Sequence, residues 1–210
     1  MSVAFDEHPG WPAILSDGPV LLRPFRRADA RDWSEVRRAN QAWLQPWEPY
    51  PLQPWHRANS PTVFRMVLRD LRRGGRDGTT MPWAVCYEGR LAGALTVGNI
   101  VRRAFCSGYA GYWVDGRVAG RGVIPTALAL AVDHAFGPGG LHRIEVNIRP
   151  ENKPSRRVVE KLGFREEAYH RNYLHIGGAW RDHIGYALTV EDLAVDGSLL
   201  ARWHRARQGF

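Results

Sequence analysis

Cysteine and lysine are both scarce in this chain of 210 residues. The two cysteines, Cys86 and Cys106, form no C-x-x-C pair. Their spacing excludes a disulfide framework and gives no sign of a zinc site, so we expect a reduced protein without a metal. Basic charge is carried almost entirely by arginine, because lysine occurs only at Lys153 and Lys161.

Long apolar runs are also missing. No stretch approaches the roughly 20 apolar residues that span a bilayer. The first eleven residues include Asp6 and Glu7 and lack the basic-then-apolar pattern of a signal peptide. We therefore expect a cytoplasmic protein with no membrane partner. No repeat or long linker divides the chain, and its length suits one well-buried core.

Positive charge and tryptophan are plentiful instead. The formal net charge of +8 suits anionic partners such as nucleic acid, a phosphorylated cofactor or an acidic protein. A GC-rich genome that encodes arginine in place of lysine explains it equally well. The chain holds nine tryptophans, and aromatic residues gathered in polar loops often line sites rather than cores.

Apolar periodicity predicts an α/β chain with a mixed sheet. The expected order is a strand, two helices, three strands, a helix, a strand, a helix and two strands. Their ranges are 20–23, 27–40, 60–73, 82–87, 91–100, 107–115, 123–136, 143–149, 152–162, 164–175 and 179–190. Four prolines between residues 43 and 55 predict an aromatic-rich loop without helix. For the polar, basic end at 191–210, a helix and a frayed terminus both fit.

A glycine-rich turn lies between the strand at 107–115 and the helix at 123–136. Arg117, Gly120 and Gly122 form an Arg-x-x-Gly-x-Gly pattern. Such a turn lets several backbone N–H groups point at one anion at the positive end of a helix. It is neither a Rossmann fingerprint nor a Walker A loop, because it lacks G-x-G-x-x-G and no Lys-Ser or Lys-Thr follows. Alone, the turn is a weak signal for a phosphate-bearing ligand.

A second motif begins about thirty residues later. The segments GYWVDGRVAGRG, LHRIEVNIRPENKPSRRVVEKLGF and RNYLHIGGAWRDHIGYAL follow one another. Together they resemble the GNAT acyl-CoA N-acyltransferase superfamily, and in particular the RimJ/RimL-type N-terminal acetyltransferases of ribosomal proteins. The resemblance runs from about residue 20 to residue 190. Departures are small: Pro154 stands where a small residue is usual, and Ile124-Pro125 where Met-Thr or Ala-Thr is common.

The resemblance implies a single GNAT domain at 18–190, between an N-terminal extension at 1–17 and a basic C-terminal tail at 191–210. Its fold class is α/β (α+β). A mixed, mostly antiparallel sheet of six to seven strands would be flanked by helices. The fourth and fifth strands, 107–115 and 143–149, would splay apart and hold acetyl-CoA between them.

The resemblance also implies how the cofactor is held. The backbone from Tyr112 to Val114, including Trp113, would pair with the pantetheine arm, and the Val114 N–H would stabilise the oxyanion of the tetrahedral intermediate. Asn152 would hydrogen-bond the lower arm, and Ser155 would act as general acid toward the departing thiolate. The pyrophosphate would be held by the backbone amides of Arg117, Val118, Ala119, Gly120, Arg121 and Gly122. The remaining phosphate contacts would come from the side chains of Arg121, Arg156 and Lys161.

Each of these assignments has a structural alternative. Asn152 can simply cap the helix that it begins. Ser155 can be a solvated helix residue, and the two glycines can serve a tight turn without a ligand. Arg156 and Lys161 can be ordinary surface charges.

The acceptor is expected to be the α-amine of a protein. With a pKa near 7.7–8.0, about a tenth to a third of it is unprotonated at cytosolic pH, so only a modest base or a water relay is needed. Candidate bases are Glu145, Tyr173, His175 and His183, of which Glu145 is the first to test. A salt bridge of Glu145 to Arg143, and a structural role for His183, are the alternatives. The acceptor wall is assigned to Trp43, Trp47, Glu48 and Tyr50, with Tyr173 and His175.

The function expected from the sequence is transfer of acetyl from acetyl-CoA to a protein N-terminus by direct attack in a ternary complex, with a ribosomal protein as the favoured acceptor. A lysine or small-molecule amine acceptor is the alternative within the class. A CoA-binding module without catalysis and an RNA-binding module are more remote. The arginines look scattered and no RNA-binding motif appears, so direct nucleic-acid binding is not expected. Proximity to the ribosome stays open, as do the monomer and the homodimer.

Overall fold

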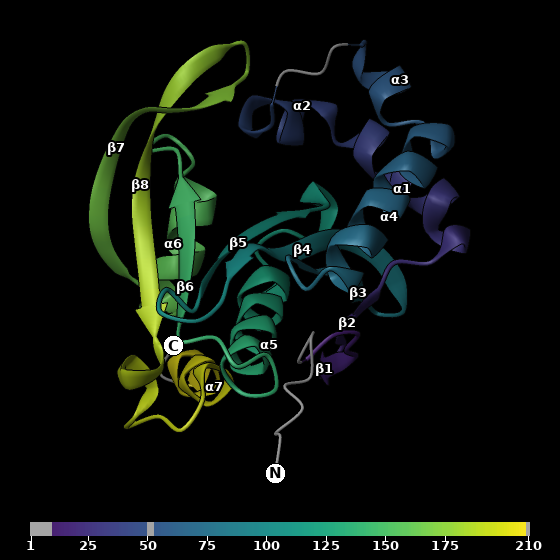
Figure 1. Cartoon of the computed structure of the whole chain (residues 1–210). Helices are drawn as coiled ribbons and strands as arrows, with labels where there is room; N and C mark the ends of the chain where they lie inside the picture. Colours follow the sequence, from purple (N-terminus) through teal and green to yellow (C-terminus); the bar gives the residue numbers. More distant parts are fainter. Residues whose placement is uncertain (1–9, 50–52, 209–210) are drawn as a thin grey trace.

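One eight-stranded sheet forms the centre of the computed structural model, which describes residues 10–49 and 53–208 (Figure 1). The strands lie in the order β1-β2-β3-β4-β5-β6-β8-β7. Every neighbouring pair is antiparallel except β5 and β6, which are parallel. The strands are β1 (Leu15–Asp17), β2 (Val20–Pro24), β3 (Met81–Tyr87), β4 (Arg90–Val101), β5 (Ser107–Val114), β6 (Arg143–Ile148), β7 (Arg165–Ile176) and β8 (Ala179–Thr189).

The mixed, mostly antiparallel sheet confirms the expected fold class, with one strand more than the six to seven expected. The additional strand is β1, which pairs with β2 across a turn at Gly18. Gly18 has φ +51°, a left-handed conformation that glycine adopts without steric cost. A strand of three residues is too short to give an alternating pattern in the sequence, so β1 was missed.

The expected splay lies between β5 and β6. These strands pair only where Ser107–Tyr109 lies against Arg143–Glu145. Beyond Tyr109, β5 continues to Val114 with β4 on one side and no pairing to β6 on the other. The backbone of β5 therefore has an open edge, and this edge is the starting point of the site.

Helix α5 (Val123–Phe136) covers one face of the sheet, and α6 (Lys153–Lys161) lies beside it. Residues 123–132 of α5 are all buried, which explains why the helix is apolar on every side. The basic tail is not frayed, because α7 (Leu199–Gln208) packs on α5. The carboxylate of Asp133 accepts the N–H groups of Leu199 and Leu200 at 2.6 and 3.0 Å and so caps the start of α7. Trp203, 5% exposed, anchors α7 in the core.

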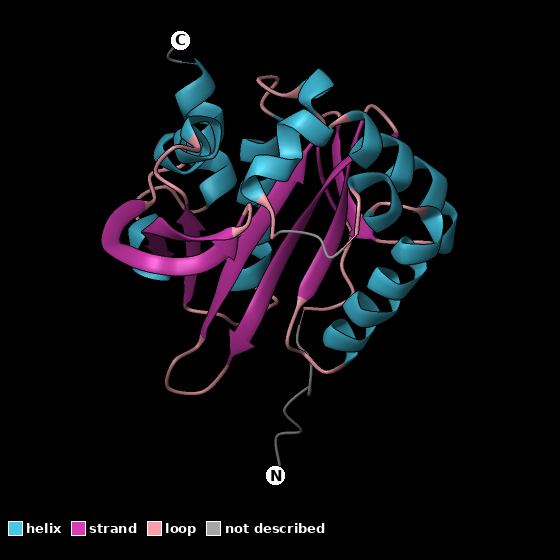
Figure 2. Cartoon of the chain, turned by 90° about the horizontal axis from the view of Figure 1, so that it is seen from above, coloured by secondary structure: helices cyan, strands magenta, loops and turns pink. Residues whose placement is uncertain are grey.

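The other face of the sheet carries α1 (Ala30–Ala39) and α4 (Pro61–Arg76), so helices lie on both faces (Figure 2). A second apolar cluster, built around Phe25, Trp33 and Phe64, fills this side. The segment expected as one helix at 27–40 opens with the 3₁₀ turn η1 (Arg27–Asp29) before α1.

The segment at 43–55 is more ordered than its prolines predicted. It includes the end of α2 (Gln41–Leu44), the 3₁₀ turn η2 (Gln45–Trp47) and the start of α3 (Trp55–Ala58). Pro46 lies in the first turn of η2 and Pro54 precedes α3, where the missing proline N–H has no helical partner to lose. The expectation of a loop without helix was therefore wrong.

None of the helices in the described part of the chain combines the length and the apolar character needed to cross a membrane.

Candidate active site

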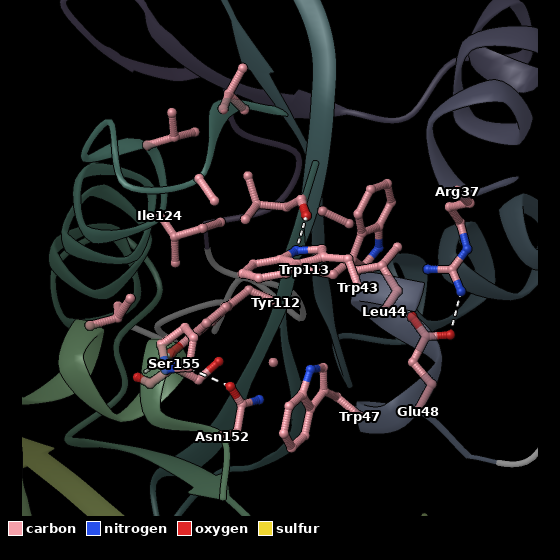
Figure 3. A pocket seen from close by; sticks show the side chains of 18 of the residues that line it. Arg37, Trp43, Leu44, Trp47, Glu48, Tyr112, Trp113, Ile124, Asn152 and Ser155 are labelled. Atoms are coloured by element: carbon pink, nitrogen blue, oxygen red, sulfur yellow. Dashed lines mark hydrogen bonds and ion pairs between the residues drawn. The ribbon is translucent and has the colours of Figure 1, made fainter. Parts of the chain in front are cut away.

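A cavity of about 1530 Å³ lies at the open end of β5 (Figure 3). One part is lined by the glycine turn, the start of α5, α6 and α7. The other part is lined by α1, the segment 42–49 and α4. Six of the nine tryptophans line it, namely Trp33, Trp43, Trp47, Trp55, Trp113 and Trp203. The cavity thus joins the two faces of the sheet, and the tryptophans gather around a site.

The glycine turn offers fewer free amides than the sequence led us to expect. Four of the six N–H groups at 117–122 already donate hydrogen bonds within the turn. These are Arg117 to the Asp115 carboxylate, Val118 to Asp115 O, Ala119 to Gly116 O and Arg121 to Val118 O. Gly120 and Gly122 make no such bond among the described residues, and the first turn of α5 adds the N–H groups of Val123 and Ile124. An anion is therefore expected against residues 120–124.

Left-handed backbone at both glycines shapes this turn. Gly120 has φ +80° and Gly122 has φ +79°, and Gly122 is the N-cap of α5. Apart from the chain neighbours of Gly120, no described residue lies within 4 Å of the position that a Cβ there would take. The space beside Gly120 belongs to the cavity, which favours a ligand over packing as the reason for a glycine there.

Arg117 itself supports the turn from outside the cavity. Its guanidinium forms ion pairs with Asp115 at 2.6 Å and Glu35 at 3.7 Å. Burial by itself raises the pKa of Asp115, but hydrogen bonds from Arg117 and Asn40 outweigh it and lower that pKa. Asn40 also accepts the Gly116 N–H at 2.8 Å. These contacts fix the end of β5 to the start of the turn.

The open edge of β5 presents Val114 toward the gap. The Asp115 N–H donates to Ala92 O on β4 at 2.7 Å. Because successive N–H groups of a strand point to opposite sides, the N–H of Val114 points to the side where β6 has separated. On the same side, Trp43 Nε1 donates to the Val114 carbonyl at 3.0 Å. A free donor in this position fits the oxyanion role that the family resemblance implies for Val114.

Asn152 and Ser155 stand together at the start of α6. Asn152 Oδ1 accepts the Ser155 N–H at 3.3 Å, so the capping alternative is correct, and both side chains also line the cavity. Tyr112 Oη donates to the Ser155 carbonyl at 3.2 Å. Burial raises the pKa of Tyr112, so its hydroxyl stays protonated. Two hydroxyl groups therefore lie near the open edge of β5, and only Ser155 was expected there.

The cationic wall of the cavity lacks one expected residue and includes two that were not expected. Arg121 and Lys161 line it as expected, but Arg156 does not. Arg156 Nε donates to Tyr186 Oη at 3.0 Å and Nη2 lies 3.8 Å from Glu160, on the other side of α6. Its neighbour Arg157 takes the place, and α7 contributes Arg207.

Arg37 is the centre of the opposite wall. It is 8% exposed and bonded to Glu48 and Asn59. Its guanidinium carbon lies 5.1 Å from the ring centroids of Trp33 and Trp113 and 5.3 Å from that of Trp55. Glu48 therefore lines the cavity as expected, but as the partner of a buried arginine.

The segment that carries Trp47 and Glu48 is held from two other elements. Arg149, after β6, donates to Pro46 O at 2.8 Å, and its guanidinium carbon lies 5.3 Å from the Trp47 ring. Gly177, between β7 and β8, donates its N–H to Glu48 O at 3.1 Å. The tip of the long β7–β8 hairpin thus contacts the residue that follows η2, on the side of the molecule where α2 lies (Figure 1). Contacts from Arg149 and Gly177 therefore hold the segment of Trp47 and Glu48 in place across the gap between β5 and β6.

Several candidates do not join the cavity. Glu145 pairs with Arg143 at 2.8 Å, which is the alternative left open for it. Tyr173 packs between His170 and His183, and burial lowers the pKa of His183. His175 lies edge-on to Trp180 in the β7–β8 hairpin. None of these four candidate bases is among the described lining residues, and Tyr50 lies outside the described residues.

Sequence reasoning missed Arg37, Arg157, Arg207 and the hydroxyl of Tyr112, of which only the backbone was expected at the site. A signal existed for Arg37, because it follows Ala30 and Trp33 at helical spacing on the buried face of α1. Tyr112 shares its strand face with the buried Ala110. The surface positions of Arg157 and Arg207 carry no such signal, since only the packing of α6 and α7 against α5 brings them to the same cavity.

Replacing Gly120 by valine is expected to raise the KM for acetyl-CoA at least tenfold. The β-branched side chain would project into the open space beside the free amides and would resist a φ of +80°. Steady-state kinetics on the purified variant test this, with thermal unfolding as the check on folding. Gly89→Val is the matched control: Gly89 also has φ +76° with nothing within 4 Å, but it lies in the β3–β4 turn. Equal KM values for the two variants would contradict an anion site at Gly120.

Comparison with known proteins agrees with this geometry. The family model described as Acetyltransferase (GNAT) domain matches residues 20–165. The [Ribosomal protein uS5]-alanine N-acetyltransferase of Escherichia coli is 30% identical over 183 residues, covering 85% of this chain and 91% of that protein. The solved structure of Mycobacterium smegmatis RimJ in complex with CoA-disulfide is 40% identical, with a TM-score of 0.92 over 95% of this chain and 97% of that one. The ribosomal-protein-S5-alanine acetyltransferase of Vibrio fischeri is 27% identical, with a TM-score of 0.78 over 86% and 98%.

Proposed function

The chain belongs to the GNAT acetyltransferase family, and from this premise we propose that it transfers acetyl from acetyl-CoA to the N-terminal α-amine of a ribosomal protein. The observation that carries the proposal is the single cavity that joins the free amides of the glycine turn to an aromatic wall around Glu48. The ribosomal acceptor rests on the relatives named for that activity. Such a reaction takes place in the cytoplasm.

Acetyl-CoA supplies the activated acyl group as a thioester. The amides at 120–124 would receive the pyrophosphate, where the positive end of α5 favours an anion. Arg121, Arg157, Lys161 and Arg207 would face the phosphates, because all four line that part of the cavity. The open edge at Tyr112–Val114 would bind the pantetheine amides, and the Val114 N–H would face the thioester oxygen.

Ser155 is the proposed proton donor to the departing sulfur. It stands at the start of α6, and the Asn152 cap fixes its backbone relative to the open edge of β5. The Tyr112 hydroxyl holds the Ser155 carbonyl from the β5 side. The two contacts orient the serine, and its own hydroxyl would carry the proton.

The acceptor would enter between the tryptophans of the opposite wall. Glu48 would attract the ammonium form of a free N-terminus, while Arg37 fixes the position of its carboxylate. An α-amine with a pKa near 8 loses its proton readily, so water in the cavity can accept it without a strong base. Water therefore takes the role of proton acceptor that was expected of Glu145, which does not line the cavity.

Acetyl-CoA turnover against a panel of acceptors tests the proposal. We expect transfer to peptides that begin with Ala, Ser or Met, and none to an N-terminally blocked peptide with an internal lysine or to spermidine. Exclusive transfer to the lysine peptide or the polyamine would reject the N-terminal acceptor. A thermal shift with excess acetyl-CoA separates binding from acceptor choice, since a ligand of the native state raises the apparent stability. No shift would reject the cofactor site itself.

A further inference from the structure

Five arginines form a stripe along the outside of α4. Arg65, Arg69, Arg72, Arg73 and Arg76 are all exposed. They recur at intervals of three and four residues, which places them on one side of a helix, along about 16 Å of its axis. Helix formation therefore places five arginines from residues 65–76 on one side of α4.

No internal partner accounts for this charge. Within residues 10–49 and 53–208, none of the five arginines takes part in an ion pair or a side-chain hydrogen bond. Three of their pairs stand four residues apart, a spacing at which like charges each cost a helix about 0.2–0.5 kcal/mol. Arg73 and Arg76 lie in the last turn of α4, where a cation is favourable, but the other three arginines have no such compensation. Repulsion between neighbouring arginines is therefore only partly offset within α4.

We propose that the arginine stripe of α4 binds the phosphate backbone of RNA. The stripe is linear and made of arginine alone, whose planar fork of donors matches phosphate oxygens. Contacts of this kind recognise the backbone rather than a base sequence. An amphipathic helix with a basic side is also typical of an acidic membrane surface, but the apolar face of α4 is already buried, with Phe64 at 0% and Leu68 at 3% exposure. No apolar face is left to enter a bilayer.

The position of the stripe connects it to the site. Val67 and Leu71 of α4 line the acceptor part of the cavity, while the five arginines of the same helix are exposed. A polyanion bound there would lie next to the acceptor wall. If the proposed function holds, the acceptor would be a protein N-terminus presented beside RNA. RNA binding itself does not depend on that function and is measured without any acceptor.

The test compares the full chain with two triple variants of equal net charge. The first, Arg69→Gln/Arg72→Gln/Arg76→Gln, removes three of the five arginines of the stripe. The second, Arg90→Gln/Arg103→Gln/Arg171→Gln, removes exposed arginines from other surfaces that line no part of the cavity. Binding of a fluorescent RNA hairpin of about 16 base pairs is followed by anisotropy over a range of salt concentrations.

We expect the stripe variant to bind RNA at least tenfold more weakly, with the slope of log K against log salt reduced by about 2 to 3. The control variant should keep the slope of the parent chain. Acetylation of a short peptide and thermal stability should be unchanged in both, which shows that the fold is intact. Equal weakening in both variants would overturn the proposal, because net charge alone would then explain binding. An equal affinity of the parent chain for poly-glutamate would also overturn it and assign the stripe to acidic proteins.

Discussion

Replacing Ser155 by alanine is expected to lower kcat about a hundredfold while leaving the KM for acetyl-CoA within about twofold. The hydroxyl is proposed to donate a proton only as the sulfur departs, so its loss should affect the chemical step and not binding. The backbone contacts of residue 155, with Asn152 Oδ1 and Tyr112 Oη, do not involve the side chain and are retained in alanine. Single-turnover measurements with saturating acetyl-CoA are the direct readout.

Two further variants make this prediction specific. Ser155→Thr keeps a hydroxyl at the same place and should recover most of the activity. Tyr112→Phe removes the other hydroxyl at this edge and should act more weakly, because in the structure that group holds the Ser155 carbonyl. If Ser155→Ala kept its full kcat while Tyr112→Phe lost most of it, Tyr112 and not Ser155 would be the proton donor.

The cofactor side of the site was largely predictable because its features are local in the sequence. A strand, a glycine turn and a helix follow one another within 107–136, and the backbone itself provides the ligand groups. The cap at Asn152 likewise depends on the Ser155 N–H three residues away. The number of free amides was overestimated, since the sequence does not show that Asp115 and Gly116 already use those of Arg117, Val118 and Ala119.

The acceptor side was less predictable because its contacts join distant segments. Arg37 contacts Trp55 and Trp113, and Arg149 contacts Pro46 and Trp47. No local pattern records such pairs. The same reasoning explains the C-terminal tail, whose helix is fixed by the Asp133 carboxylate of α5. The polar composition of residues 191–210 fitted both a helix and a frayed terminus. A few long-range contacts decide in favour of the helix.

Replacing Arg37 by methionine is expected to lower the free energy of unfolding by about 3 kcal/mol. Methionine fills much of the volume between the three tryptophans, but it leaves the Glu48 carboxylate and Asn59 Oδ1 without their donor. Urea unfolding followed by tryptophan fluorescence measures the change. Arg37→Lys keeps the charge but cannot reach both acceptors from a planar fork, so it should show an intermediate loss.

The kinetic consequence distinguishes a binding wall from a purely structural cluster. Glu48→Gln is the matched variant, since it removes the charge, keeps an oxygen for Arg37 and should cost less stability than the loss of Arg37. If Glu48 attracts the N-terminal ammonium, Glu48→Gln raises the KM for a peptide with a free N-terminus several-fold and leaves the KM for acetyl-CoA unchanged. An unchanged KM for that peptide would rule out this role. Arg37 and Glu48 would then stabilise the tryptophan wall only, and acceptor recognition would rest on its shape.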